Sequence, residues 1–158
     1  ITKIKASITP HHLILNRTDM LAHKIKPHYY CLPILKKEAD RKALLEVALN
    51  GNKKFFLGTD SAPHNITDKE QECGCAGIFN TIHSLEMLAQ IFDDNQKIHN
   101  LEKFVSLNGA KHYSLKINKG KTKLKKIPQP IKFPKFLNFE DKQIKVFSPP
   151  FKVYWSII

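Results

Sequence analysis

Two side chains that can bind a metal ion or transfer a proton lie close together in the stretch FFLGTDSAPH. Asp60 follows a short apolar run that stops at Gly58, and His64 comes four residues later. In parallel α/β proteins the chemistry takes place at the carboxyl ends of the strands. A carboxylate at such a position is costly to bury unless it is paired or bound to a metal. Asp60 is therefore a candidate metal ligand and proton acceptor.

The same stretch also fits a structural role. An Asp before Ser-Ala-Pro suits an Asx-turn or a helix cap, and a single loop histidine is usually part of the polar surface. The pattern alone leaves both interpretations of Asp60 and His64 open.

The elements that must position these residues form a strand–helix–strand unit. Residues 1–9 carry β-branched side chains in loose alternation, which predicts a strand. Residues 36–50 place apolar side chains at helical spacing and end in Asn-Gly, which predicts a helix. Its expected inner face is Ala39, Ala43, Leu44, Val47 and Ala48. Residues 54–59 are short and largely apolar, as in a strand buried on both faces of a parallel sheet. This order predicts an α/β fold.

Two long loops accompany this unit. Residues 10–35, which contain three prolines, and residues 60–79 are predicted as loops, and long ordered loops in compact domains are usually functional. Amphipathic helices are predicted at about residues 81–92 and 101–107, with their apolar stripes facing the core.

The pattern changes after residue 115. Five of the nine prolines lie beyond this point, with short apolar pieces between and after them. We expect two parts: a main α/β part of residues 1–115, and an extension of residues 116–158. The extension is predicted to be irregular, with one or two edge strands that pack on the main part.

The charge pattern and the lack of long apolar runs argue against two classes of partner, nucleic acids and membranes. The net charge of +12 comes largely from scattered lysines, and the chain has only two arginines, Arg17 and Arg41. This pattern is more typical of a solvated surface than of a nucleic-acid site. No apolar run is long enough to span a membrane. We therefore expect neither nucleic acid nor membrane as a partner.

The three cysteines, Cys31, Cys73 and Cys75, form an odd set without a secretory signal, which fits the reducing cytoplasm. A structural zinc site built from Cys73, Cys75, His64 and His83 is an alternative, although Cys-Gly-Cys lacks the usual spacing of a zinc knuckle.

Four separated motifs point further. They are TPHHLILNR, KPHYYCLPILK, FLGTDSAPH and CGCAGIFN, in this order along the chain. Together they resemble the C-terminal half of the bacterial single-function (class II) dihydroorotases, members of the amidohydrolase superfamily. FVSLNGAKHYSL and the closing KVYWSI are also similar to segments of that family.

The resemblance implies a fold and a reaction. The fold is the C-terminal part of a (β/α)8 TIM barrel with a short irregular extension. The reaction is the zinc-dependent, reversible cyclisation of N-carbamoyl-L-aspartate to L-dihydroorotate in pyrimidine synthesis. A cytoplasmic homodimer with two Zn²⁺ ions in each active site is implied as well.

The resemblance also implies roles for four residues. Asp60 binds one zinc ion and moves the proton of the reacting water, and His64 faces the substrate carboxylate. Leu32 and Ala76 contact the pyrimidine ring mainly through their backbones. A backbone N–H and C=O can match the donor and acceptor of an amide group, which agrees with that role.

The remaining metal ligands of the family are not in these residues. An H-x-H motif, a carboxylated lysine and two further histidines are expected upstream, and PHH at His11 and His12 is not H-x-H. A (β/α)8 barrel needs about 250 residues. We therefore expect the chain to be a fragment that needs the upstream half of the barrel as its partner.

Three other functions stay open. A related cyclic amidohydrolase, such as a hydantoinase-like enzyme, is the nearest alternative. An inactive dihydroorotase-like module that only binds a partner is the second. A basic RNA-binding module is the third, and it predicts strongly salt-dependent binding.

Overall fold

The first two strands form a parallel pair in the computed structural model, which describes residues 4–158. β1 (Ala6–Ile8) pairs with β2 (Phe55–Leu57), with Ala6 opposite Phe55. Helix α3 (Glu38–Leu49) lies in the connection between them and packs on β2. The predicted strand–helix–strand unit is confirmed, except that residues 1–3 of the first predicted strand lie outside the described residues.

The loop predicted over residues 10–35 is wrong. This segment contains α1 (Pro10–Ile14), α2 (Arg17–Leu21) and the 3₁₀ turn η1 (Pro27–Tyr29). Helices of five residues are too short to show a hydrophobic period in the sequence. They are specified by their first turns instead.

The caps of the two short helices use side chains just before them. The hydroxyl of Thr9 accepts the backbone N–H of His12 at 3.2 Å, and a proline at the first helical position suits α1. The side chain of Asn16 accepts the backbone N–H of Asp19 at 3.2 Å, while the Asp19 carboxylate accepts that of Asn16 at 2.7 Å. This reciprocal capping box starts α2.

Helix α3 buries less of its predicted inner face than expected. Ala48 is buried, and Leu44 and Val47 are half-buried, but Ala39 and Ala43 are exposed. The first turn of α3 instead makes polar contacts, from Arg41 to the carbonyl of Leu13 and from Asn16 to Glu38, and its apolar contribution to the core comes from the last two turns.

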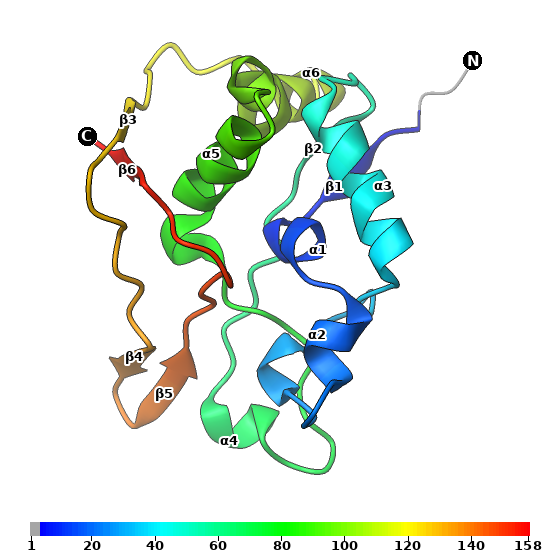
Figure 1. Ribbon diagram of the computed structural model, residues 1–158, viewed down its shortest axis with the longest axis vertical. Coiled ribbons are helices and arrows are strands. Elements are labelled where there is room, and N and C mark those ends of the chain that lie inside the picture. The colour runs from blue at the N-terminus through cyan, green and yellow to red at the C-terminus, as the bar shows by residue number, and fades with distance from the viewer. Residues whose placement is uncertain (1–3) are drawn as a thin grey trace.

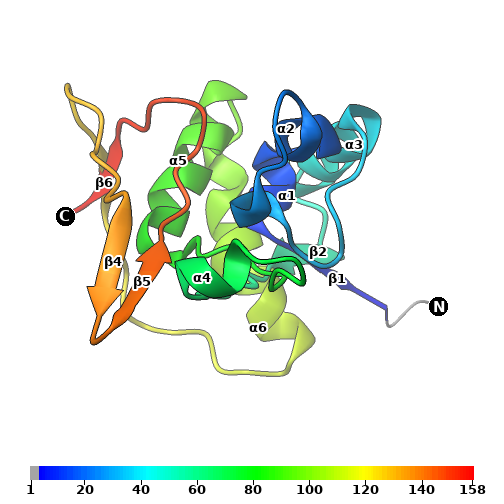
Figure 2. The same cartoon turned by 90° about the horizontal axis from the view of Figure 1, so that it is seen from below.

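Helix α5 (Ser84–Asp94) is the central helix of the described structure. It follows the 3₁₀ turn η2 (Thr81–His83), and nearly all its side chains are buried. Helices α1, α2 and α3 lie to one side of α5, and the C-terminal residues lie to the other (Figures 1 and 2). The remaining helical segments are α4 (Ile66–Lys69), which interrupts the second predicted loop, η3 (Ile98–Asn100), the π-helical η4 (Lys103–Leu107) and α6 (Asn108–His112).

Residues 116–158 contain more strand than predicted. β3 (Leu124–Lys126) pairs antiparallel with β6 (Trp155–Ile157), and β4 (Phe136–Phe139) forms a hairpin with β5 (Lys142–Lys145). Figure 2 shows β6 beside α5 and the hairpin beside α4, in agreement with the contacts between these elements.

Hydrogen bonds connect residues 116–158, the extension, to α5. The backbone N–H of Tyr154 donates to the amide oxygen of Gln90 at 2.8 Å, and the indole N–H of Trp155 donates to Asp93 at 3.2 Å. Phe147 and Val153 are buried and belong to the same hydrophobic core as α5. The extension thus packs on the main part through apolar side chains as well as hydrogen bonds.

One hydrophobic core joins the strand pair, the helices and the extension. Its most buried large apolar side chains are Leu13, Leu35, Met87, Leu88, Phe92, Phe104 and Val153. Within residues 4–158, no helix combines the length and the apolar character needed to cross a membrane.

Candidate active site

The carboxyl ends of β1 and β2 open into a cleft of about 700 Å³. Because the strands are parallel, both end at the same edge of the sheet. Asp60 and Leu32 line this cleft, together with His12 and Gly58. Two of the four residues predicted from the sequence are thus brought to one cavity.

Gly58 allows the two strand ends to approach closely. A Cβ atom at this position would lie 2.7 Å from Cβ of Ser7 on β1, which is closer than two such atoms can pack. The backbone N–H of Gly58 donates to the carbonyl of Ile8 at 3.2 Å and continues the pairing beyond β2. The absence of a side chain at residue 58 therefore fixes where Asp60 leaves the sheet.

Asp60 carries an exposed carboxylate on a backbone with φ of 43°. This left-handed conformation is uncommon for residues other than glycine, although Asp adopts it more readily than most. No hydrogen bond or ion pair within residues 4–158 engages its carboxylate. The predicted turn role, in which the side chain would bond to its own backbone, is therefore not observed, and the carboxylate can take a cation or a proton.

His12 joins the two sides of the cleft. Its Nε2 donates to the carbonyl of Pro33 at 2.8 Å, so Nδ1 accepts the hydroxyl proton of Thr9 at 2.7 Å. Burial lowers the pKa of His12, while the bond to Pro33 and the charge of Asp60 oppose that shift. A neutral imidazole thus connects the start of α1 to the loop that carries Leu32.

His64 and Ala76 form the second predicted pair. The Nε2 atom of His64 donates to the carbonyl oxygen of Ala76 at 3.0 Å, and both residues are half-buried. Next to them, Gly77 has φ of 151°, and a Cβ there would lie 2.6 Å from Cβ of Ala62 and 2.8 Å from Nε2 of His64. Glycine is therefore required for this loop to close over the histidine.

The backbone groups of Leu32 and Ala76 are only partly used. Within residues 4–158, the N–H and C=O of Leu32 and the N–H of Ala76 make no hydrogen bond. Leu32 is also largely exposed, with 62% of its surface accessible. These three groups are available to a ligand.

Two polar residues of this region were not singled out from the sequence. Lys69 donates to three backbone carbonyls of the loops around Leu32 and Ala76. The amide nitrogen of Asn80 donates to the carbonyl of Thr59 and to Nδ1 of His11, each at 2.9 Å. Tyr30, the partner of Lys69, and Thr59 and His11, the partners of Asn80, are distant in sequence, so the local pattern does not predict these contacts.

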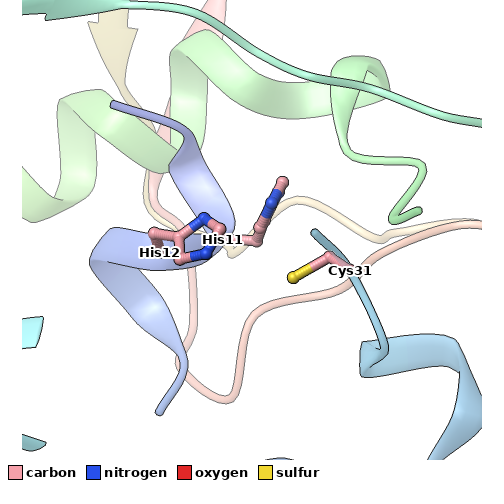
Figure 3. Close-up of side chains that lie close together, drawn as sticks. All are labelled: His11, His12 and Cys31. Carbon is pink, nitrogen blue, oxygen red and sulfur yellow. The ribbon is translucent and has the colours of Figure 1, made fainter. Parts of the chain in front are cut away.

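His11, His12 and Cys31 form a compact cluster that includes one residue of the cleft, His12, with their ligand atoms within 4.8 Å of one another. Figure 3 shows the sulfur of Cys31 pointing towards the two rings. Burial, assisted by the charge of His12, lowers the pKa of His11 to about 3, and burial raises that of Cys31 to about 11. The three groups are therefore neutral at pH 7.

The hydrogen bonds of this cluster argue against a metal site. Asn80 also donates to Thr59, so its amide nitrogen faces His11, whose Nδ1 must accept and whose Nε2 must carry the proton. Both nitrogens of His12 are already bonded. A metal would have to break these bonds. The buried Nε2 of His11 has no partner within residues 4–158.

The alternative zinc site of Cys73, Cys75, His64 and His83 is wrong. In the described part of the chain, these side chains do not form a group close enough to hold a metal ion. His64 instead donates to Ala76, and His83 lies 3.1 Å from the carboxylate of Glu86.

Known proteins resemble nearly the whole of this chain. The sequence model described as "Amidohydrolase family" matches residues 2–152. A dihydroorotase of Sinorhizobium medicae (strain WSM419) is 47% identical over 155 residues, which is 98% of this chain and 45% of that protein. A dihydroorotase of Ruegeria sp. (strain TM1040) is 45% identical over 152 residues, 96% of this chain and 44% of that protein.

Two solved structures give the same result. The crystal structure of dihydroorotase from Campylobacter jejuni matches with a TM-score of 0.82 and 33% identity, over 98% of this chain and 44% of that one. Dihydroorotase from Saccharomyces cerevisiae, in complex with 5-fluoroorotic acid, matches with a TM-score of 0.79 and 31% identity, over 99% and 43%. The chain spans about 45% of the length of the relatives it matches.

Proposed function

This chain belongs to the amidohydrolase family, and from that premise we propose that it forms part of a dihydroorotase. That enzyme reversibly cyclises N-carbamoyl-L-aspartate to L-dihydroorotate in pyrimidine synthesis. The predicted α/β fold, part of a (β/α)8 barrel, is confirmed by the match to two dihydroorotase structures over nearly the whole chain. The resemblance to the dihydroorotases is likewise confirmed by relatives of 43–47% identity.

One observation carries the proposal. Asp60 presents a carboxylate without a partner in residues 4–158, at the carboxyl ends of two parallel strands and in the cleft that Leu32 also lines. This is the end of a barrel at which catalytic groups lie. A cleft that is lined by this carboxylate, by Lys36 and by Leu32, with its free backbone N–H and C=O, suits a small polar ring.

The carboxylate of Asp60 can supply one ligand of a zinc site. An accessible carboxylate oxygen is a suitable zinc ligand, and Asp60 is the residue of this chain that would hold the metal. The other ligands, namely an H-x-H pair, a carboxylated lysine and two further histidines, would come from the rest of the barrel. When bound, zinc lowers the pKa of water to about 7 and polarises a carbonyl.

Asp60 then acts as the proton carrier. Its carboxylate accepts a proton from the attacking water when the ring opens and returns it to the leaving nitrogen. In the direction of ring closure the same oxygen takes the proton of the amide nitrogen. An exposed carboxylate on a constrained backbone can do both without a change in the fold.

His64, Leu32 and Ala76 would bind the substrate. Since Nε2 of His64 donates to Ala76, a contact with the substrate carboxylate falls to Nδ1 and requires the imidazolium form. The N–H and C=O of Leu32 and the N–H of Ala76 would match the amide groups of the ring.

The partner that we propose for this chain is the rest of the barrel, because one edge of its parallel strand pair is open. Within the described residues β1 pairs with β2 alone, and its residues Ala6 and Ser7 are exposed. A further strand would pair along that open edge. The homodimer implied by the resemblance stays a prediction.

The test uses what we call the completed enzyme: these 158 residues joined to the part of the Sinorhizobium medicae relative that they do not match. We expect turnover of carbamoyl-aspartate and dihydroorotate, with two zinc ions bound per active site. Turnover of hydantoins in their place would favour the hydantoinase-like alternative. A folded, zinc-loaded protein without activity on either class would favour the inactive binding module.

A further inference from the structure

Lys69 has a buried ammonium group at the end of a short helix. It is the last residue of α4, and only 3% of its surface is accessible. Lysine is almost never buried to this extent without a partner. No salt bridge within residues 4–158 includes it, so its charge must be stabilised in another way.

Three backbone carbonyls surround this ammonium. Its Nζ donates to Tyr30 at 2.9 Å, to Cys75 at 2.7 Å and to Gly77 at 2.7 Å. An ammonium has three protons, so every donor is used. The ring of Tyr30 lies 5.8 Å away and adds a cation–π contact.

The three carbonyls belong to two loops that carry predicted substrate-binding residues. Tyr30 lies two positions before Leu32, and Cys75 and Gly77 stand on either side of Ala76. The two loops also bond directly, because the N–H of Gly77 donates to the carbonyl of Tyr30 at 2.9 Å. The ammonium therefore fixes the spacing of Leu32 and Ala76.

The second loop is folded tightly around Lys69. A Cβ on Gly74 would lie 2.6 Å from the carbonyl oxygen of Lys69. The backbone N–H of Cys75 donates to the backbone carbonyl of Asp68 at 2.9 Å. Burial lowers the pKa of Lys69, while the thiols of Cys31 and Cys75 act in the opposite direction. The residue is enclosed, and its protons cannot reach a substrate.

We propose that Lys69 is a positioning residue for substrate binding, which holds the backbones of Leu32 and Ala76 at the separation needed to bind the ring together. This inference rests on the proposed function. The ammonium itself contacts no substrate. It aligns the free N–H and C=O of Leu32 with the free N–H of Ala76 because it donates hydrogen bonds to the backbone carbonyls next to them in the two loops.

The test compares three substitutions in the completed enzyme. Lys69→Met keeps the length of the side chain but removes every donor, and Lys69→Gln keeps two N–H donors without charge. Lys42→Met on the exposed face of α3 is the matched control. We expect the KM for dihydroorotate to rise about tenfold or more for Lys69→Met, less for Lys69→Gln and not at all for Lys42→Met. The zinc content should stay unchanged.

A second measurement does not depend on activity. Hydrogen exchange at the amide of Gly77 should become faster in Lys69→Met, while exchange at core amides of α5 stays slow. Unchanged KM and exchange would overturn the proposal, as would a loss of thermal stability with KM intact or failure of both Lys69 variants to fold. Inactivity of the parent completed enzyme would instead refute the proposed function, and the exchange result would still report on the loops.

Discussion

At the scale of single residues, the most direct prediction concerns the effect of replacing Asp60 on turnover. Asp60→Ala in the completed enzyme removes the residue that we propose as both metal ligand and proton carrier, so turnover should fall by several orders of magnitude. Asp141→Ala, in the exposed turn between β4 and β5, is the control and should keep normal turnover. A steady-state assay with zinc analysis checks both, and near-normal turnover with bound zinc in Asp60→Ala would contradict the assignment.

His64 should behave differently from Asp60. It lies on the turn beyond the strand end and donates to Ala76, so we expect it to bind substrate and not metal. His64→Ala should keep its zinc while KM rises, and His99→Ala, at an exposed position, should change neither. Metal analysis of the purified variants decides, since loss of zinc from His64→Ala would show that its role is ligation.

The lowered pKa of the buried His11 should make the stability of the protein depend on pH. Its pKa is about 3 in the folded protein and about 6.5 when unfolded, so below pH 6.5 the unfolded chain binds a proton that the folded chain does not. The free energy of unfolding should therefore fall as the pH drops from about 6.5 towards 3, by up to about 1.4 kcal/mol per unit from this group.

Denaturant unfolding of the completed enzyme between pH 7 and pH 5 measures this slope. His11→Gln should flatten it, and His99→Gln should leave it as in the parent. Equal slopes for the parent and His11→Gln would mean that folding does not change the pKa of His11.

The position of Asp60 was predictable because its causes are local. An apolar run followed by Gly-Thr-Asp marks the end of a buried strand, and the structure has that strand. The contacts of Lys69 were not predictable in this way. Its Tyr30 partner is 39 positions away, and in the sequence the lysine stands among polar residues typical of a solvated loop.

At the scale of elements, the contact between β1 and β2 depends on Gly58. Gly58→Ala would place a Cβ 2.7 Å from that of Ser7. We expect a loss of about 1–3 kcal/mol of stability and weaker activity, because the strand ends must separate. Ser7→Gly combined with Gly58→Ala should restore much of the loss.

A double-mutant cycle measured by denaturant unfolding checks this pair. A positive coupling between residues 7 and 58 is the expected result. Strict additivity of the two changes would mean that the strands do not meet at Gly58.

The long helix α3 was predicted well, and the short helices α1 and α2 were not. The helix at Glu38–Leu49 has enough turns for its period to appear, and Asn-Gly marks its end. The five-residue helices α1 and α2 depend on caps and on burial by distant residues, so the prolines around them suggested a loop. The pairing of β3 with β6 joins residues about thirty positions apart, which local alternation cannot predict.

At the scale of the whole molecule, the open edge of β1 predicts the behaviour of the isolated chain. Residues 1–158 alone should be poorly folded and prone to aggregate, since an unpaired strand edge is a template for further pairing. The charge of +12 favours solubility but does not satisfy the open edge. Size-exclusion chromatography with a thermal melt measures this.

The completed enzyme serves as the control for that experiment and should elute as a defined species. A monomer of the isolated chain with a sharp cooperative transition would show that 158 residues make a complete folding unit. The prediction that the open edge of β1 prevents the isolated chain from folding would then be wrong.

The contacts of Tyr154, Trp155 and the rest of β6 with α5 have a consequence for the order of folding during synthesis. A ribosome adds about 5–20 residues per second, so several seconds separate the completion of α5 from the arrival of β6. Throughout that interval the surface of α5 that β6 covers has no native partner. The nascent chain therefore passes through a state that chaperones can bind, and slow translation of the residues between α5 and β6 would prolong it.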